Sequence, residues 1–129
     1  MKQVPLPKPT EAELAILQVL WNRGASTVRE VYEELRVQRE TGYTTILKLM
    51  QIMARKGLVR RDESRKTHIY EATLGENRTQ RQLVRDLLDR AFSGSAEQLV
   101  MRAIETKRVS REEMDRIRKL LNTIEGGTS

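Results

Sequence analysis

The chain contains no cysteine and only one histidine, His68. Disulfide bridges, cysteine-based zinc sites and a cysteine nucleophile are therefore excluded, and so is a metal site built from several histidines. We expect neither a metal nor a cofactor. Aromatic residues make up only 4% of the sequence, which favours a helical core of leucine, isoleucine and methionine over an aromatic-rich sheet.

Long apolar runs are also missing, since none approaches the roughly 20 residues of a membrane-spanning helix. The first nine residues hold all three prolines and lack the apolar core of a signal peptide. We therefore expect residues 1–9 to be a disordered leader. We also expect no insertion into a membrane and a cytoplasmic location.

Sequence signs of catalysis are weak. The chain has no glycine-rich phosphate-binding loop. Its carboxylates fall at helix-capping and solvent positions, not within apolar stretches that would raise their pKa. We therefore expect that the protein is not an enzyme.

What the chain does contain is an uneven excess of positive charge. The net charge of the whole chain is +6. Residues 48–66 alone hold seven cations against two acids, a net charge of +5. Such a concentrated basic segment favours binding to nucleic acid, and a merely solvated basic surface is the alternative.

Two helices are predicted at the start of the chain. Thr10 with Glu13, and Thr27 with Glu30, have the spacing of a capping box, in which each side chain bonds the other residue's backbone N–H. Gly24 ends the first of these helices.

A third helix is predicted for residues 43–56, ending at Gly57. Two strands, at 58–61 and 67–73, follow with a polar turn between them. Three helices followed by such a hairpin describe a winged helix-turn-helix domain, which we assign to residues 10–75. The expected fold class is mainly α with a small β-hairpin wing.

The third helix has two different faces. At about 100° per residue, its apolar side contains Ile46, Leu49, Met50 and Met53. The opposite side contains Thr44, Lys48, Gln51 and Arg55 and no acid. Hydrogen-bonding side chains and cations on one face suit a helix that lies in the major groove of DNA.

Side chains that read bases are expected in the first half of this helix, the half that enters the groove in helix-turn-helix docking. The candidates are Tyr43, Thr44, Thr45 and Lys48. Lysine can donate to guanine, and a threonine methyl group can contact thymine. Packing at the helix start is an equal alternative for Tyr43.

Other polar and basic residues are expected to hold phosphates, which fix the register on DNA without reading sequence. The phosphate candidates are Ser26, Thr27, Gln51, Arg55, Lys56, Arg60, Arg65, Lys66 and His68. Ser26 and Thr27 would contribute backbone N–H groups at the start of the second helix.

Residues 76–125 are predicted to form a second, helical domain, and residues 126–129 a disordered tail. About 50 residues is marginal for an independent fold, so we expect the apolar faces to be covered in a homodimer. Packing onto the winged helix is the alternative. The expected dimer interface contains Leu83, Leu87, Leu88, Phe92, Leu99, Val100, Ile104, Met114, Ile117, Leu121 and Ile124.

The chain resembles the penicillinase-repressor family of bacterial transcriptional regulators, of the BlaI/MecI type, over roughly residues 8–124. The matching stretches are Thr10-Glu11-Ala12-Glu13-Leu14, Val19-Leu20-Trp21, Tyr43-Thr44-Thr45-Ile46-Leu47, Arg55-Lys56-Gly57-Leu58-Val59-Arg60-Arg61 and His68-Ile69-Tyr70-Glu71-Ala72. The resemblance implies a homodimer whose N-terminal winged helices bind a palindromic operator and block transcription, while C-terminal helical domains join the two copies.

The resemblance also raises the question of how the protein is released from its operator. Family members that control β-lactam resistance are inactivated through a membrane sensor-protease, with cleavage between an asparagine and a phenylalanine. The aligned positions here are Arg102 and Ala103, so that pair is absent. Either the specificity of a sensor-protease partner differs or release takes another route. The copper-responsive branch of the family uses a C-terminal cysteine hook, which a chain without cysteine lacks.

Two other functions fit a winged helix. A protein-interaction module usually loses the basic wing or carries acids on its third helix, and neither holds for this sequence. A non-specific DNA binder shares the basic charge but does not require a dimer with a fixed spacing between half-sites.

Overall fold

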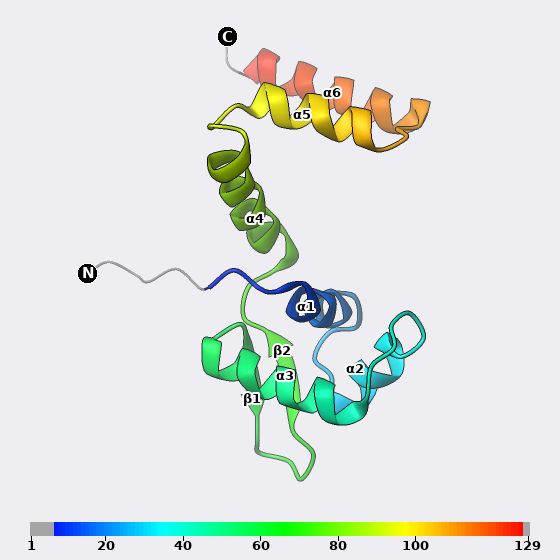
Figure 1. Ribbon diagram of the computed structural model, residues 1–129, viewed down its shortest axis with the longest axis vertical. Coiled ribbons are helices and arrows are strands. Elements are labelled where there is room, and N and C mark those ends of the chain that lie inside the picture. Colours follow the sequence, from blue (N-terminus) through cyan, green and yellow to red (C-terminus); the bar gives the residue numbers. More distant parts are fainter. Residues whose placement is uncertain (1–6, 128–129) are drawn as a thin grey trace, which may run out of the picture. The chain divides into compact units, whose positions relative to one another are not determined.

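Six helices and one β-hairpin make up residues 7–127, the part of the chain that this computed structural model describes (Figure 1). In chain order they are α1 (Glu11–Arg23), α2 (Val28–Leu35), α3 (Tyr43–Lys56), β1 (Val59–Asp62), β2 (Ile69–Ala72), α4 (Glu76–Ala91), α5 (Ala96–Thr106) and α6 (Arg111–Gly127). The predicted order of three helices, a hairpin and further helices is confirmed.

Threonine and glutamate side chains start α1 and α2. The Thr10 hydroxyl accepts a hydrogen bond from the Glu13 N–H at 3.2 Å, and the Glu13 carboxylate accepts one from the Thr10 N–H at 2.9 Å. Thr27 and Glu30 make the same exchange at 3.1 and 2.9 Å. Both predicted capping boxes are confirmed, and they satisfy N–H groups that a helix cannot bond by itself.

Gly57 ends α3 and turns the chain into β1. Its φ of +85° lies in the left-handed region that favours glycine. The N–H of the next residue, Leu58, donates back to the Met53 carbonyl at 2.9 Å. The third helix and the wing therefore follow one another without an intervening loop.

The strands β1 and β2 pair antiparallel, with Val59 opposite Ala72 and Arg61 opposite Tyr70. Ser26, in the loop between α1 and α2, forms a bridge with Tyr70, so the hairpin is joined to the helices by backbone hydrogen bonds. The core between the three helices and the hairpin consists of Ile16, Leu17, Leu20, Val28, Val31, Leu35, Ile46, Met50, Met53, Leu58, Val59 and Tyr70.

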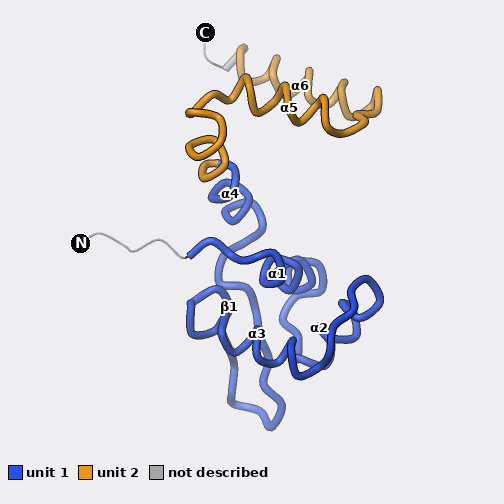
Figure 2. The backbone as a smooth tube through the Cα atoms, viewed as in Figure 1, with its two compact units in different colours: residues 1–84 blue, residues 85–129 orange. Residues whose placement is uncertain are grey.

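The chain divides into two compact units, Met1–Val84 and Arg85–Ser129 (Figure 2). The division falls within α4, whereas we placed the domain boundary between residues 75 and 76. Contacts near the start of α4 explain the difference. Thr79, in the first turn of α4, is only 4% exposed.

Two features near the ends of the described residues differ from the predicted bounds. Pro9, which we assigned to the disordered leader, is buried. Gly126 and Gly127, which we assigned to the tail, lie in α6. The remainder of those two predictions falls on residues 1–6 and 128–129, which lie outside the described residues.

The second unit buries none of its apolar side chains fully. None of its described residues is buried. Its large exposed hydrophobic residues are Leu87, Val100, Met101, Ile104, Leu120, Leu121 and Ile124, with exposed fractions between 37% and 59%. No helix within residues 7–127 has both the length and the apolar character needed to cross a membrane.

Candidate nucleic-acid interface

The two faces of α3 are separated as the sequence indicated. Ile46, Met50 and Met53 are buried, with exposed fractions of 3%, 0% and 0%. Leu49, the remaining residue of that face, is partly buried. The polar residues Thr44, Thr45, Lys48, Gln51 and Arg55 are all exposed. The helix carries no acid, so its exposed face presents only hydrogen-bonding groups and positive charge to a partner.

The start of α3 differs from the starts of α1 and α2. Its N-cap residue is Gly42, which makes no side-chain cap hydrogen bond, and its first turn contains no acid. The first N–H groups of α3 therefore lack the side-chain acceptors that cap the other two helices. Such an uncapped N-terminus carries partial positive charge and favours an anion nearby.

A hollow lies between the start of α2, the exposed face of α3 and the wing. We call it the wing hollow, and it is lined by Thr27, Val28, Arg29, Tyr43, Leu47, Gln51, Arg61, Lys66, Thr67, His68 and Tyr70. None of these described lining residues is acidic. Four of the predicted phosphate candidates line this hollow together with Tyr43, which we predicted to read a base; they are Thr27, Gln51, Lys66 and His68.

Tyr43 packs at the helix start and still remains 38% exposed. Its ring meets the Tyr32 ring edge to face, with 5.8 Å between the centroids. The Arg29 guanidinium covers the Tyr43 ring at 4.9 Å from its centroid. The structure is therefore compatible with both alternatives for Tyr43, packing at the helix start and contact with a base. Neighbouring side chains hold its ring in place, while part of the ring stays accessible.

The exposed wing loop carries Arg65 and Lys66. Its turn is closed by Asp62, whose carboxylate accepts a hydrogen bond from the Ser64 N–H at 2.9 Å. Hydrogen bonds from Ser64 hold the pKa of Asp62 below its usual value. Within the hairpin, Arg60 on β1 is paired with Glu71, which lies opposite it on β2, at 3.0 Å.

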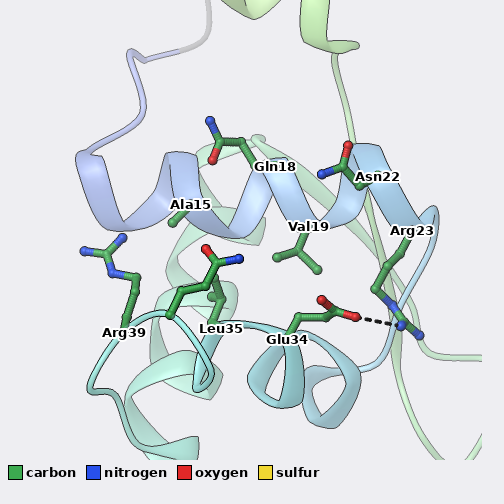
Figure 3. Close-up of a pocket in the computed structure, with 9 residues that line it drawn as sticks. Ala15, Gln18, Val19, Asn22, Arg23, Glu34, Leu35 and Arg39 are labelled. Atoms are coloured by element: carbon green, nitrogen blue, oxygen red, sulfur yellow. Dashed lines mark hydrogen bonds and ion pairs between the residues drawn. The ribbon is translucent and has the colours of Figure 1, made fainter.

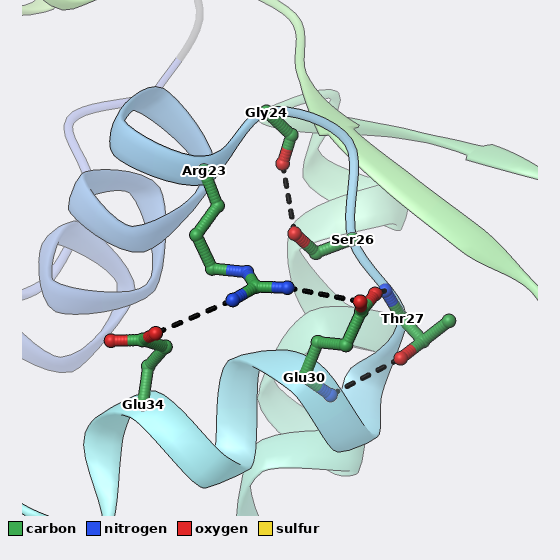
Figure 4. Close-up of polar contacts among 6 residues, drawn as sticks. All are labelled: Arg23, Gly24, Ser26, Thr27, Glu30 and Glu34. Atoms are coloured by element: carbon green, nitrogen blue, oxygen red, sulfur yellow. Dashed lines mark hydrogen bonds and ion pairs between the residues drawn. The ribbon is translucent and has the colours of Figure 1, made fainter.

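Ser26 is a correction to the predicted phosphate contacts. It is fully buried; its N–H donates to the Tyr70 carbonyl at 2.9 Å and its hydroxyl donates to the Gly24 carbonyl at 2.8 Å. Figure 4 shows that the neighbouring Thr27 N–H is likewise engaged, with the Glu30 carboxylate as its acceptor. The backbone N–H groups of both residues are therefore already used within the protein and do not bind a phosphate.

The Glu30 carboxylate is held from two sides. The Thr27 N–H lowers the pKa of Glu30 most, and Arg23 lowers it further. Arg23 also reaches Glu34 at 3.3 Å, so one guanidinium joins two turns of α2 (Figure 4). These contacts fix the start of α2, which borders the wing hollow.

Lys56 is a second correction. Its ammonium group donates to the Glu13 carboxylate at 2.8 Å, and the Glu13 side chain is only 2% exposed. Burial raises the pKa of Glu13, but hydrogen bonds from Lys56 and Thr10 outweigh burial and hold it below its usual value. Lys56 therefore joins the end of α3 to the start of α1 and is not a free phosphate ligand.

Arg29 and Arg61 line the wing hollow but were not among our predicted contacts. In sequence, Arg29 is one of many charges on a short helix, and nothing marks it as a neighbour of Tyr43. Arg61 lies within the basic segment, which was the available signal. The hydrogen bond of Arg61 with Tyr70 raises its pKa most, and Glu63 contributes further.

A second hollow lies between α1 and the end of α2 (Figure 3). Its lining residues are Ala15, Gln18, Val19, Asn22, Arg23, Glu34, Leu35, Gln38 and Arg39. The ion pair between Arg23 and Glu34 occupies part of this lining. Amides and charges of both signs make this hollow a poorer match to phosphate than the wing hollow.

The predicted dimer residues that lie in the second unit occur on all of its helices and are exposed or partly buried. Leu83, at the end of the first unit, is partly buried. Arg102 and Ala103, which align with the cleaved pair, are exposed on α5. Arg102 forms an ion pair with Glu105 one turn further along the helix.

Comparison with solved structures agrees with the winged-helix fold. The solution structure of the monomeric form of BlaI from Bacillus licheniformis, in complex with the blaP half-operator, superposes with a TM-score of 0.50. It is 22% identical and covers 57% of this chain and 89% of that chain. The DNA-binding domain of the repressor BlaI matches with a TM-score of 0.50 at 24% identity, over 59% and 90% of the two chains.

Sequence relatives extend the similarity beyond this domain. The transcriptional regulator BlaI of Mycobacterium tuberculosis is 33% identical over 119 residues, which cover 91% of this chain and 85% of that protein. The methicillin resistance regulatory protein MecI of Mammaliicoccus sciuri is 22% identical over 88% of this chain and 92% of its own. The family model of the penicillinase repressor matches residues 9–123. The chain therefore belongs to the penicillinase repressor family.

Proposed function

We propose that this protein is a homodimeric transcriptional repressor that binds a palindromic operator through α3 and the wing. The observation that carries this proposal is the acid-free exposed face of α3, which continues into the wing hollow. Relatives named as transcriptional regulators and repressors support it, as does the winged-helix likeness to a repressor solved with half-operator DNA.

The exposed face of α3 supplies the residues that would read bases. Thr44, Thr45 and Lys48 stand in the first two turns, where a recognition helix enters the major groove. Tyr43 joins them at the edge of the face. Other exposed polar and basic side chains would hold phosphates on either side of the groove. They are Gln51, Arg55, Arg60, Arg65, Lys66 and His68.

The dimer is inferred from the second unit. Leu121 and Ile124 are 56% and 54% exposed on α6, and Val100 is 47% exposed on α5. An apolar surface spread over several helices of a small unit usually marks a protein contact. A second copy would also add sequence specificity. One recognition helix contacts only a few base pairs, whereas two copies bound to two half-sites specify a whole operator.

Selection of DNA from a random-sequence pool tests the proposal. The wild-type chain is expected to enrich a sequence with two inverted half-sites about one helical turn or a multiple apart. Sedimentation analysis of the free protein should show a dimer. Enrichment of no sequence would leave only non-specific DNA binding, and failure to bind any duplex would favour a protein-interaction module.

The proposal also bears on the cellular location of the protein and on its release from DNA. A repressor acts where the chromosome is, so we place the protein in the cytoplasm. A membrane sensor-protease is a candidate partner, and the exposed Arg102–Ala103 bond on α5 is the position to monitor. Mass spectrometry of the protein from induced cells would identify the bond cut, or show that the chain stays intact.

A further inference from the structure

We propose that Arg29 of α2 binds a DNA phosphate in the wing hollow while it holds Tyr43 in place with the same guanidinium group. This inference rests on the proposed function, since it presupposes that α3 lies in the major groove. It adds a side chain of α2 to a surface to which the sequence had assigned, from this helix, only the backbone N–H groups at its start.

The first argument is the geometry of the guanidinium. It stands 4.9 Å from the centroid of the Tyr43 ring and 5.9 Å from that of Tyr32. A guanidinium that lies over an aromatic ring keeps its N–H donors directed away from the ring face. The two tyrosines thus orient Arg29 without using its hydrogen-bond donors.

The second argument is that Arg29 is weakly paired within the protein. Its ion pair with Glu33 is long, at 3.6 Å. Glu33 is already bound more closely by Arg36, at 2.9 Å. The Arg29 side chain remains 65% exposed, so a phosphate can approach it without displacing a strong internal partner.

The third argument is charge. Arg29 lines the wing hollow together with Arg61 and Lys66, and no acid is among the described lining residues; Arg61 is also paired with Glu63, at 2.5 Å. The hollow lies beside α3, so DNA that holds α3 in its groove brings a flanking backbone close to the start of α2 and to the wing. A phosphate is the ligand that suits several convergent cations.

Phosphate binding by Arg29 would also affect the position of the Tyr43 ring. A phosphate on Arg29 would fix the guanidinium, and the guanidinium in turn would fix the ring that begins α3. Backbone binding and the orientation of a candidate base-reading side chain would then depend on the same residue.

The test compares Arg29→Gln, Arg29→Lys and the control Arg36→Gln. Arg36 is matched because it also lies over Tyr32, at 6.0 Å, and pairs with Glu33, yet it is not among the described residues that line the wing hollow. Dissociation constants are measured over a salt series, on a duplex enriched by the wild-type chain and on a random-sequence duplex.

Arg29→Gln is expected to weaken binding to both duplexes and to reduce the slope of log K against log salt by about 0.9 for each phosphate that the residue neutralises. Arg29→Lys should keep the slope but lower the preference for the enriched duplex, because an ammonium group cannot stack on Tyr43 as a guanidinium does. Arg36→Gln should leave both the slope and the preference unchanged.

Three results would overturn the inference. A wild-type slope for Arg29→Gln would mean that Arg29 touches no phosphate. An equal reduction of the slope in Arg36→Gln would mean that the salt dependence of DNA binding reflects the total positive charge of the protein and not a phosphate contact of Arg29. A wild-type preference in Arg29→Lys would remove the link to Tyr43. If instead the wild-type chain enriches no sequence, the proposed function fails before any variant is compared.

Discussion

Lys48 stands near the middle of the exposed face of α3, where no acid of the same helix neutralises it. If its ammonium group donates to a guanine, Lys48→Ala should weaken binding to the enriched duplex by about 1–3 kcal/mol, with a much smaller effect on random-sequence DNA. Fluorescence anisotropy titration measures both values. Lys107→Ala, an exposed lysine beyond the end of α5, is the control. Equal effects on both duplexes would make Lys48 a phosphate ligand.

Glu13 is the buried acid of the winged helix, and it accepts hydrogen bonds from Thr10 and Lys56. Replacing it by glutamine should lower the free energy of unfolding by about 1–2 kcal/mol, because the bond to a charged partner is weakened while Lys56 can still reach water. Urea denaturation at neutral pH measures this change. Glu11→Gln, an exposed position in the same first turn, should have little effect.

The same residue predicts a pH dependence. The pKa of Glu13 is lower in the folded chain than its ordinary value of 4.5. A lowered folded-state pKa adds stability above the unfolded pKa, and this stability is lost as the pH falls through the folded value. Denaturation midpoints should therefore decline more steeply below about pH 4.5 in the wild type than in Glu13→Gln. Parallel declines would show that other carboxylates, such as Glu30 and Asp62, account for the acid sensitivity.

At the scale of one element, α3 is bounded by two glycines with different backbone requirements. Gly57 has a φ of +85°, whereas Gly42 has a φ of −102°, which any residue can adopt. Gly57→Ala should therefore destabilise the fold by roughly 1–2 kcal/mol, the cost of a side chain in the left-handed region. Gly42→Ala meets no atom within 4 Å of the added Cβ and serves as the control. Thermal unfolding compares them, and equal effects would contradict the assigned role of Gly57.

At the scale of the whole molecule, dimerisation should depend mainly on the second unit, which holds ten of the eleven predicted interface residues. Leu121→Glu places a charge on an apolar face of α6, so the dimer dissociation constant should rise at least about tenfold, equivalent to roughly 1.4 kcal/mol. Sedimentation equilibrium measures it. Val37→Glu is the matched control, because Val37 is 81% exposed but lies in the first unit. A dimer that weakens with Val37→Glu and not with Leu121→Glu would refute this placement.

Local patterns in the chain were sufficient to predict the elements. The capping pairs that begin α1 and α2, the glycine that ends α3 and the spacing that puts Ile46, Met50 and Met53 on one face of α3 are all set by residues close together in the sequence. Patterns at such short range can be recognised without knowing how the rest of the chain packs. The acid-free face of α3 follows from the same kind of local pattern. The family could be recognised because several such short stretches occur in the expected order along the chain.

The state of individual side chains at the interface required the fold. Lys56 and Glu13 are 43 residues apart and still share a hydrogen bond, which removes Lys56 from the candidate phosphate ligands. Ser26 gives its N–H to Tyr70 of the wing, and Arg29 lies over Tyr43 of the next helix. The cations look alike in the sequence, because which of them has a partner depends on contacts between residues that only folding brings together.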